Sequence, residues 1–112
     1  METKIALIGT GGTIAGKGAS DTDLTGYIAG VLGLDEILAS VPGTEPYGPY
    51  TYTQFSNIES SDITVKHWLD LSKQVQQLVD QDDIGGVVIT HGTDSMEETS
   101  YFLNLTVHTD KP

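Results

Sequence analysis

Short apolar runs alternate with longer amphipathic stretches along the chain, and their order predicts strands and helices. Residues 87–89 are three consecutive β-branched residues without polar alternation. Such a run is typical of a strand buried on both faces of a parallel sheet. The apolar run at 4–8 (KIALI) predicts a second buried strand, and the alternating stretch at 51–56 (TYTQFS) predicts a third.

Three further segments have helical periodicity. The segment 34–41 predicts a short helix ended by Pro42 and Gly43. The segment 64–81 predicts the longest helix, with one apolar stripe made of Val65, Trp68, Leu69, Val75, Leu78 and Val79. A third helix begins at Ser95, which is spaced from Glu98 as in a capping box. Its predicted buried face consists of Met96, Thr99, Phe102, Leu103 and Thr106.

The alternation of strands and helices predicts an α/β fold, a three-layer doubly wound sheet of mainly parallel strands. We expect residues 1–112 to form one unit, without an internal domain boundary. Residues 17–33 are rich in Gly, Ser, Thr and Asp and are predicted to form a long loop. The pattern calls for another parallel strand after the last helix. We therefore expect the sheet to be incomplete and the chain to be the amino-terminal piece of a longer protein.

The charge balance narrows the classes of partner. Sixteen acidic and five basic residues give a formal net charge of -11, which repels nucleic acid and acidic membrane surfaces. No apolar run approaches the roughly 18 residues that a membrane-spanning helix needs. We expect a cytoplasmic protein if Met1 is the native start, whereas removal of a signal peptide would leave the same sequence. The chain contains no cysteine, so disulfides and thiolate metal sites do not apply.

Two threonines follow predicted strands, at the edge where open α/β sheets bind ligands. Thr13 follows a run of glycines after the first strand, and Thr93 follows the strand at 87–89 with Asp94 beside it. A threonine hydroxyl that is activated by a base can attack a carbonyl carbon, and N–H groups of the glycine turn can stabilise the oxyanion. The alternative is that both threonines only cap turns and helices.

Other kinds of site fit the sequence less well. Gly16 and Lys17 resemble the end of a phosphate-binding P-loop, but Gly18 stands where Ser or Thr is needed, and the dinucleotide fingerprint fails at Ile14. Nucleotide binding is therefore disfavoured. No histidine has a partner at the spacing of a zinc site, so we expect no metal. His91 could act as a base, but a hydrogen-bonded structural role is favoured.

Two long segments carry a family resemblance. IALIGTGGTIAG at 5–16 and VVITHGTDSMEETSYFLNLTV at 87–107 resemble the amino-terminal part of bacterial type II L-asparaginases. The resemblance implies hydrolysis of L-asparagine to L-aspartate and ammonia, with some activity on L-glutamine and no cofactor or metal. It also implies a homotetramer built from intimate dimers, a second smaller domain beyond this chain, and a periplasmic location if a signal peptide is removed.

The same resemblance assigns roles to individual residues. Thr13 resembles the nucleophile, and Tyr27 the lid tyrosine that hydrogen-bonds near it. Thr93 resembles the second catalytic threonine, and Asp94 the carboxylate that binds the substrate's α-ammonium group. Ser60 resembles the serine that holds the α-carboxylate group. Together these residues would orient one small amino-acid substrate.

Three further points concern the expected site. The backbone N–H groups of Gly12 and Thr93 are candidate oxyanion donors. Ser61 stands where the family usually has a longer glutamine or glutamate that touches the substrate, which leaves the preference for asparagine or glutamine open. The family's catalytic lysine is expected beyond residue 112. The alternative function is a catalytically incomplete fragment that only binds an amino acid such as aspartate.

Overall fold

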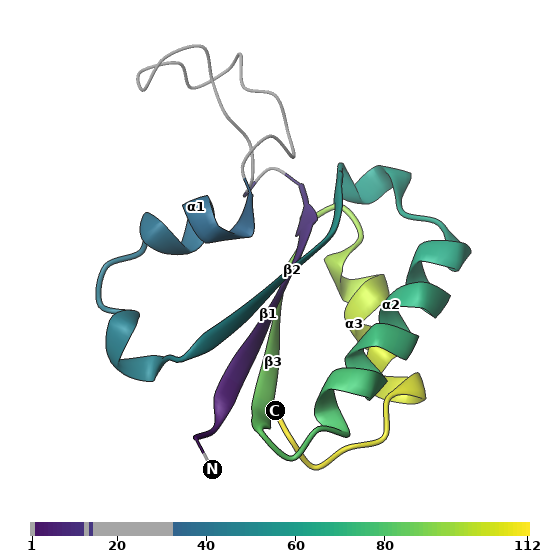
Figure 1. Ribbon diagram of the computed structural model, residues 1–112. Helices are drawn as coiled ribbons and strands as arrows, with labels where there is room; N and C mark the ends of the chain where they lie inside the picture. Colours follow the sequence, from purple (N-terminus) through teal and green to yellow (C-terminus); the bar gives the residue numbers. More distant parts are fainter. Residues whose placement is uncertain (1, 13, 15–32) are drawn as a thin grey trace, which may run out of the picture.

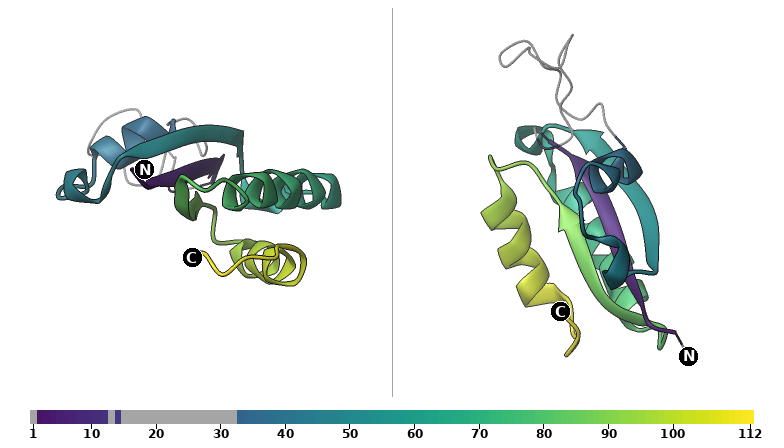
Figure 2. Two further views of the ribbon diagram at one scale, coloured as in Figure 1. Left: turned by 60° about the horizontal axis from the view of Figure 1, so that its bottom comes forward. Right: turned by 90° about the vertical axis from the view of Figure 1, so that its left-hand side faces the viewer.

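One parallel sheet organises the molecule. The computed structural model describes residues 2–12, 14 and 33–112. Its strands are β1 (Lys4–Gly11), β2 (Tyr50–Ile58) and β3 (Ile84–Thr90), arranged in the order β2-β1-β3 (Figure 1). Helix α1 (Leu34–Ala39) lies on one face of the sheet, and α2 (Val65–Val79) and α3 (Met96–Thr106) lie on the other (Figure 2). The predicted three-layer α/β fold is therefore confirmed.

The predicted strands and helices are all present, with shifted ends. Helix α1 ends at Ala39 rather than at residue 41, and α2 spans Val65–Val79 rather than 64–81. Short 3-10 turns at Glu45–Tyr47 and Ser60–Asp62 flank β2. The second of these turns carries Ser60 from the end of β2 towards α2.

The central strand β1 is the one buried on both faces. Ala6, Leu7 and Ile8 expose 1%, 6% and 0% of their surface. The prediction that β3 is buried on both faces is wrong, because Val88 is 51% exposed. Helix α1 packs on β1 and β2, so the side of β3 that carries Val88 lies beyond its cover among the described residues.

Helix α2 contributes most of the core on its face of the sheet. Leu71, Val75 and Val79 are buried and cluster with Ile8. The predicted stripe is partly wrong, because Val65 and Leu69 are 62% and 57% exposed. At 100° per residue, Leu69 lies about 120° around the helix from Val75, which turns it away from the sheet.

The first turn of α2 is held by side chains that the sequence analysis did not single out. The Thr64 hydroxyl accepts from the His67 N–H, and the His67 Nδ1 accepts from the Thr64 N–H at 2.9 Å, which forms a capping box. On the exposed face, the Lys66 ammonium donates to the Asp70 carboxylate at 2.7 Å. This hydrogen bond lowers the pKa of the Asp70 carboxyl below its ordinary value.

Helix α3 begins at Ser95 as predicted, but the predicted capping box with Glu98 is absent. The Ser95 hydroxyl donates instead to the carbonyl of Ser60 at 2.7 Å and makes no cap hydrogen bond. Met96, expected on the buried face, is 50% exposed. The tertiary bond to Ser60 ties the start of α3 to the 3-10 turn after β2.

Helix α1 is attached to the sheet through Gln54 of β2. The Gln54 Oε1 accepts from the Leu34 N–H at 3.0 Å, at the start of α1. A Cβ atom on Gly9 would lie 2.9 Å from the Gln54 amide, so the glycine leaves the space that this side chain needs. Leu34, the first residue of α1, is itself buried.

Candidate active site

The segments that follow the three strands meet at one edge of the sheet. The Gly12 N–H, after β1, donates to the carbonyl of Ile58 at the end of β2 at 2.8 Å. The Asp94 N–H, after β3, donates to the hydroxyl of Ser60 at 3.0 Å. This is the carboxyl edge of a parallel sheet, where α/β proteins bind ligands.

Two glycines allow this close approach. A Cβ atom on Gly12 would lie 2.5 Å from the Cα atom of Gly92, and Gly12 has a φ of +82°. A Cβ atom on Gly92 would lie 2.7 Å from the Ser60 hydroxyl. Side chains at these positions would push the three segments apart, so packing requires glycine at both positions, and the positive φ requires it at Gly12 as well.

The hydroxyls of buried Thr10 and half-buried Ser56 connect the strand ends next to this point. The Thr10 hydroxyl donates to the carbonyl of Thr90, and the Ser56 hydroxyl donates to the carbonyl of Thr10, both at 2.7 Å. These bonds join β1 to both of its neighbours. The sequence analysis missed both residues, although their signal is visible as small polar residues near the ends of predicted strands.

The structure brings four of the predicted substrate residues together. Ser60 is buried, with 4% of its surface exposed, whereas Ser61, Thr93 and Asp94 are exposed. Because the Asp94 N–H bonds the Ser60 hydroxyl, the carboxylate of Asp94 and that hydroxyl lie on adjacent segments. Thr13 and Tyr27 lie outside the described residues.

The two candidate oxyanion donors differ in whether their N–H group already makes a hydrogen bond. The Gly12 N–H is engaged by the Ile58 carbonyl, so the geometry does not support its use as an oxyanion donor. Within the ranges that the structure describes, no hydrogen bond occupies the Thr93 N–H. The Thr93 N–H is therefore the stronger candidate, and Gly12 acts here through its lack of a side chain.

His91 has the structural role that the sequence favoured. It is 8% exposed, its Nδ1 lies 2.7 Å from the carbonyl oxygen of Gly92, and its Nε2 lies 2.8 Å from the hydroxyl oxygen of Thr99. Both ring nitrogens are thus occupied by protein groups. A buried ring with two partners is not available as a base for a substrate.

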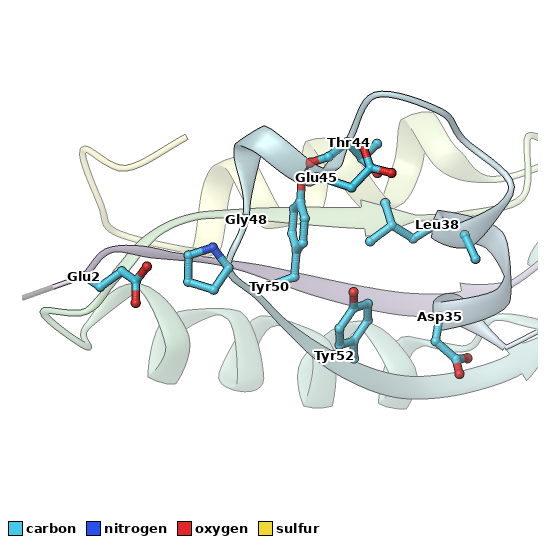
Figure 3. Close-up of a pocket in the computed structure, with 10 residues that line it drawn as sticks. Glu2, Asp35, Leu38, Thr44, Glu45, Gly48, Tyr50 and Tyr52 are labelled. Carbon is cyan, nitrogen blue, oxygen red and sulfur yellow. Dashed lines mark hydrogen bonds between the residues drawn. The ribbon is translucent and has the colours of Figure 1, made fainter.

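A separate hollow lies on the α1 side of the sheet. It has a volume of about 520 Å³ and is lined by Glu2 and by residues of α1, of the segment before β2 and of β2 itself (Figure 3). Tyr50 and Tyr52 stand next to each other in it, with ring centroids 6.4 Å apart. None of the predicted site residues lines the hollow, so we do not take it as the active site.

Two classes of feature are absent from the described part of the chain. Residues 2–12, 14 and 33–112 contain no group of three or more His, Asp or Glu side chains that could hold a metal ion. Among the described helices, none is both long and apolar enough to cross a membrane.

Comparison with known proteins identifies similar chains. The family model described as "Asparaginase, N-terminal" matches residues 4–112. A glutaminase-asparaginase from Acinetobacter glutaminasificans is 46% identical over 111 residues, which cover 99% of this chain and 34% of the relative. L-asparaginase 2 from Bacillus subtilis is 45% identical over 108 residues, which cover 96% of this chain and 29% of the relative.

The fold of the chain is also similar to that of a solved L-asparaginase structure. The probable cytoplasmic L-asparaginase from Campylobacter jejuni superposes with a TM-score of 0.83 at 45% identity, over 91% of this chain and 31% of that one. The chain therefore spans about a third of the length of the relatives that it matches.

Proposed function

The chain belongs to the asparaginase family, since the family model covers residues 4–112, and from this premise we propose that the protein hydrolyses the side-chain amide of L-asparagine to L-aspartate and ammonia. The observation that carries the proposal is the meeting of three strand ends at one edge of the sheet. There the Asp94 N–H contacts the Ser60 hydroxyl, and Gly12 packs against Gly92.

The proposed reaction uses a threonine nucleophile. The Thr13 hydroxyl loses its proton to a base and its oxygen bonds to the amide carbon, which gives a tetrahedral intermediate. The Thr93 N–H stabilises the oxyanion. The C–N bond then breaks, the nitrogen takes a proton and leaves as ammonia, and water opens the acyl ester to release aspartate. Activation proceeds through Tyr27 or through Thr93 and Asp94 with a lysine that the resemblance locates beyond residue 112.

Two charged groups of the substrate need partners. The Asp94 carboxylate is exposed and carries the charge that an α-ammonium group requires. The Ser60 hydroxyl accepts from the Asp94 N–H, so its own hydrogen remains for an α-carboxylate oxygen. Because that bond joins the Asp94 backbone to the Ser60 hydroxyl, the residues that bind the two groups on the α-carbon are held next to each other.

Ser61 sets how much room is left beside the substrate. Its side chain is exposed, and it is shorter than the glutamine or glutamate that the family resemblance leads us to expect there. We expect the extra space to admit L-glutamine as a second substrate, with ammonia release slower than from L-asparagine. Glutamine hydrolysis that is undetectable beside active asparagine hydrolysis would contradict this expectation.

The whole protein is expected to be a homotetramer. Among the described residues, α2 and α3 expose large apolar side chains that a partner subunit can cover, namely Val65, Leu69, Tyr101 and Leu105. Sedimentation equilibrium of the full-length protein should give four times the mass of one protomer. A monomer at micromolar concentration would contradict the assembly.

The test of the proposed reaction is ammonia release by threonine variants of the full-length protein. Thr13→Val and Thr93→Val should each lower kcat about 10³-fold or more, because each removes a hydroxyl from the reacting centre. Thr53→Val is the matched control, since Thr53 lies within β2 and away from the strand ends. Near-normal ammonia release from either site variant would overturn the assignment.

The alternative is that the 112 residues bind an amino acid without turning it over. The observation that favours it is that the proposed substrate ligands Ser60 and Asp94 are joined within this chain, whereas the matched relatives are about three times longer. L-aspartate binding by a protein that releases no ammonia would select this alternative.

A further inference from the structure

A chain of hydrogen bonds runs from α2 through α3 to the segment after β3, and its last two bonds are buried. The Trp68 indole N–H donates to the Thr99 hydroxyl oxygen at 2.8 Å. That oxygen lies 2.8 Å from the His91 Nε2, and the His91 Nδ1 lies 2.7 Å from the Gly92 carbonyl oxygen. Thr99 and His91 expose only 3% and 8% of their surface. The two bonds of the His91 ring are therefore shielded from water, and hydrogen bonds are stronger in such a low-dielectric interior.

The partners determine the direction of each bond. A carbonyl oxygen can only accept, so the His91 Nδ1 must carry a hydrogen in either charge state of the ring. An indole N–H can only donate, so the Thr99 oxygen accepts from Trp68. The Thr99 hydroxyl hydrogen is then free to be donated to the neutral Nε2. All donors point from the helices towards Gly92.

The last bond fixes a peptide group rather than a side chain. The Gly92 carbonyl belongs to the peptide bond that ends in the Thr93 N–H. This peptide is not among the cis peptides of the structure, and in a trans peptide the C=O and N–H groups point in opposite directions. A carbonyl held on the His91 ring therefore turns the Thr93 N–H away from the ring. The bond also polarises the peptide, which strengthens the N–H as a donor.

The other side of Gly92 is held just as closely. Gly92 packs against Gly12 and against the Ser60 side chain. A Cβ atom on Gly12 would come within 2.5 Å of the Cα atom of Gly92. The backbone at Gly92 thus lies between the His91 ring and the segments after β1 and β2. It has little room to rotate while both contacts stand.

We propose that His91 is a positioning residue, which holds the Gly92 carbonyl so that the Thr93 N–H is aimed at the oxyanion. Thr99 and Trp68 hold the ring in the orientation that this requires. The inference rests on the proposed function, because the Thr93 N–H matters only where a carbonyl carbon is attacked. It predicts an effect on the transition state and little effect on ground-state binding of the substrate.

Two amide substitutions separate the ring nitrogens of His91 in the full-length enzyme. The side-chain N–H of Asn falls near the position of Nδ1, whereas that of Gln reaches the position of Nε2. We expect His91→Gln to lower kcat for L-asparagine about tenfold, since misaiming a donor costs less than removing it. KM should stay within about twofold, and His91→Asn should lose no more than about threefold in kcat.

A second pair of substitutions tests whether Thr99 holds the His91 ring in place. Thr99→Val keeps the shape of the side chain but removes the hydroxyl, whereas Thr99→Ser retains the hydroxyl. Thr99→Val should lower kcat severalfold at nearly constant KM, and Thr99→Ser should restore it. The amide proton shift of Thr93 should move upfield in His91→Gln and Thr99→Val, and much less in His91→Asn and Thr99→Ser.

The outcomes distinguish the two levels of the proposal. An unmodified protein without ammonia release refutes the proposed function, and the positioning role of His91 with it. An active protein in which His91→Gln leaves kcat unchanged refutes the positioning role alone. Equal losses in His91→Asn and His91→Gln, in parallel with equal losses in unfolding free energy, would mean that His91 only stabilises the fold, which also overturns the inference.

Discussion

Gly12 and Gly43 have the same backbone torsion but different surroundings. Both have a φ of +82°, yet a Cβ atom on Gly12 would clash with Gly92, whereas a Cβ atom on Gly43 would meet nothing within 4 Å. In the full-length protein, Gly43→Ala should cost about 1–2 kcal/mol of unfolding free energy through backbone strain alone. Gly12→Ala should cost about 1–3 kcal/mol more, because the strand ends must separate.

Urea unfolding of the two variants checks this difference, with Gly43→Ala as the control. Equal losses would mean that the contact between Gly12 and Gly92 has no energetic role. In that case the proposed site would not depend on the close approach of the segments after β1 and β3.

At the scale of single residues, the sequence predicts which residues can do chemistry better than it predicts which residues touch. The positions of Thr93 and Asp94 after a β-branched run identified the carboxyl edge of the sheet, because parallel strands end at one edge. The bond from Ser95 to Ser60 could not be predicted, since it joins residues 35 positions apart. A local capping pattern competes with such tertiary bonds, and in this protein the tertiary bond formed instead.

At the scale of elements, α2 offers a matched pair of leucines. Leu71 is 2% exposed within the core cluster, whereas Leu69 is 57% exposed two positions earlier. In the full-length protein, Leu71→Ala should lower the unfolding free energy by about 2–5 kcal/mol through a buried cavity. Leu69→Ala should change it by no more than about 0.5 kcal/mol.

Thermal or urea unfolding of both variants measures the contrast. A loss for Leu69→Ala as large as that for Leu71→Ala would contradict the orientation of α2 on the sheet. The same result would restore the stripe predicted from the sequence, in which Leu69 faces the core.

Periodicity therefore located the helices but not their rotation. The residues Val65 and Leu69 are apolar and lie on the flank of the buried stripe, so a count of apolar positions cannot separate them from the core. The wrong prediction for Val88 in β3 has the same cause, because an apolar side chain does not show by itself whether another element covers it. A β-branched run predicts a strand, but only the cover supplied by α1 decides which of its side chains are buried.

At the scale of the whole molecule, the order of elements was sufficient to predict the architecture. Strand and helix alternate from Lys4 to Thr106, and this alternation admits few arrangements other than helices on both faces of a parallel sheet. In the strand order β2-β1-β3, the central strand β1 is also the most buried one. The stretch Ala6 to Ile8 and the run at 87–89 are equally apolar in the sequence. Their composition therefore could not show which of the two strands is central.

The central claim is that the three strand ends form one site for a small α-amino acid. Titration of the ¹⁵N-labelled full-length protein with L-aspartate tests it most directly. The amide signals of Gly12, Ser60 and Thr93 should shift together with a single dissociation constant, and Asp94→Asn should weaken it at least about tenfold through the loss of the ion pair. Signals that stay in place at millimolar L-aspartate, or that shift at only one of the three segments, would contradict the account.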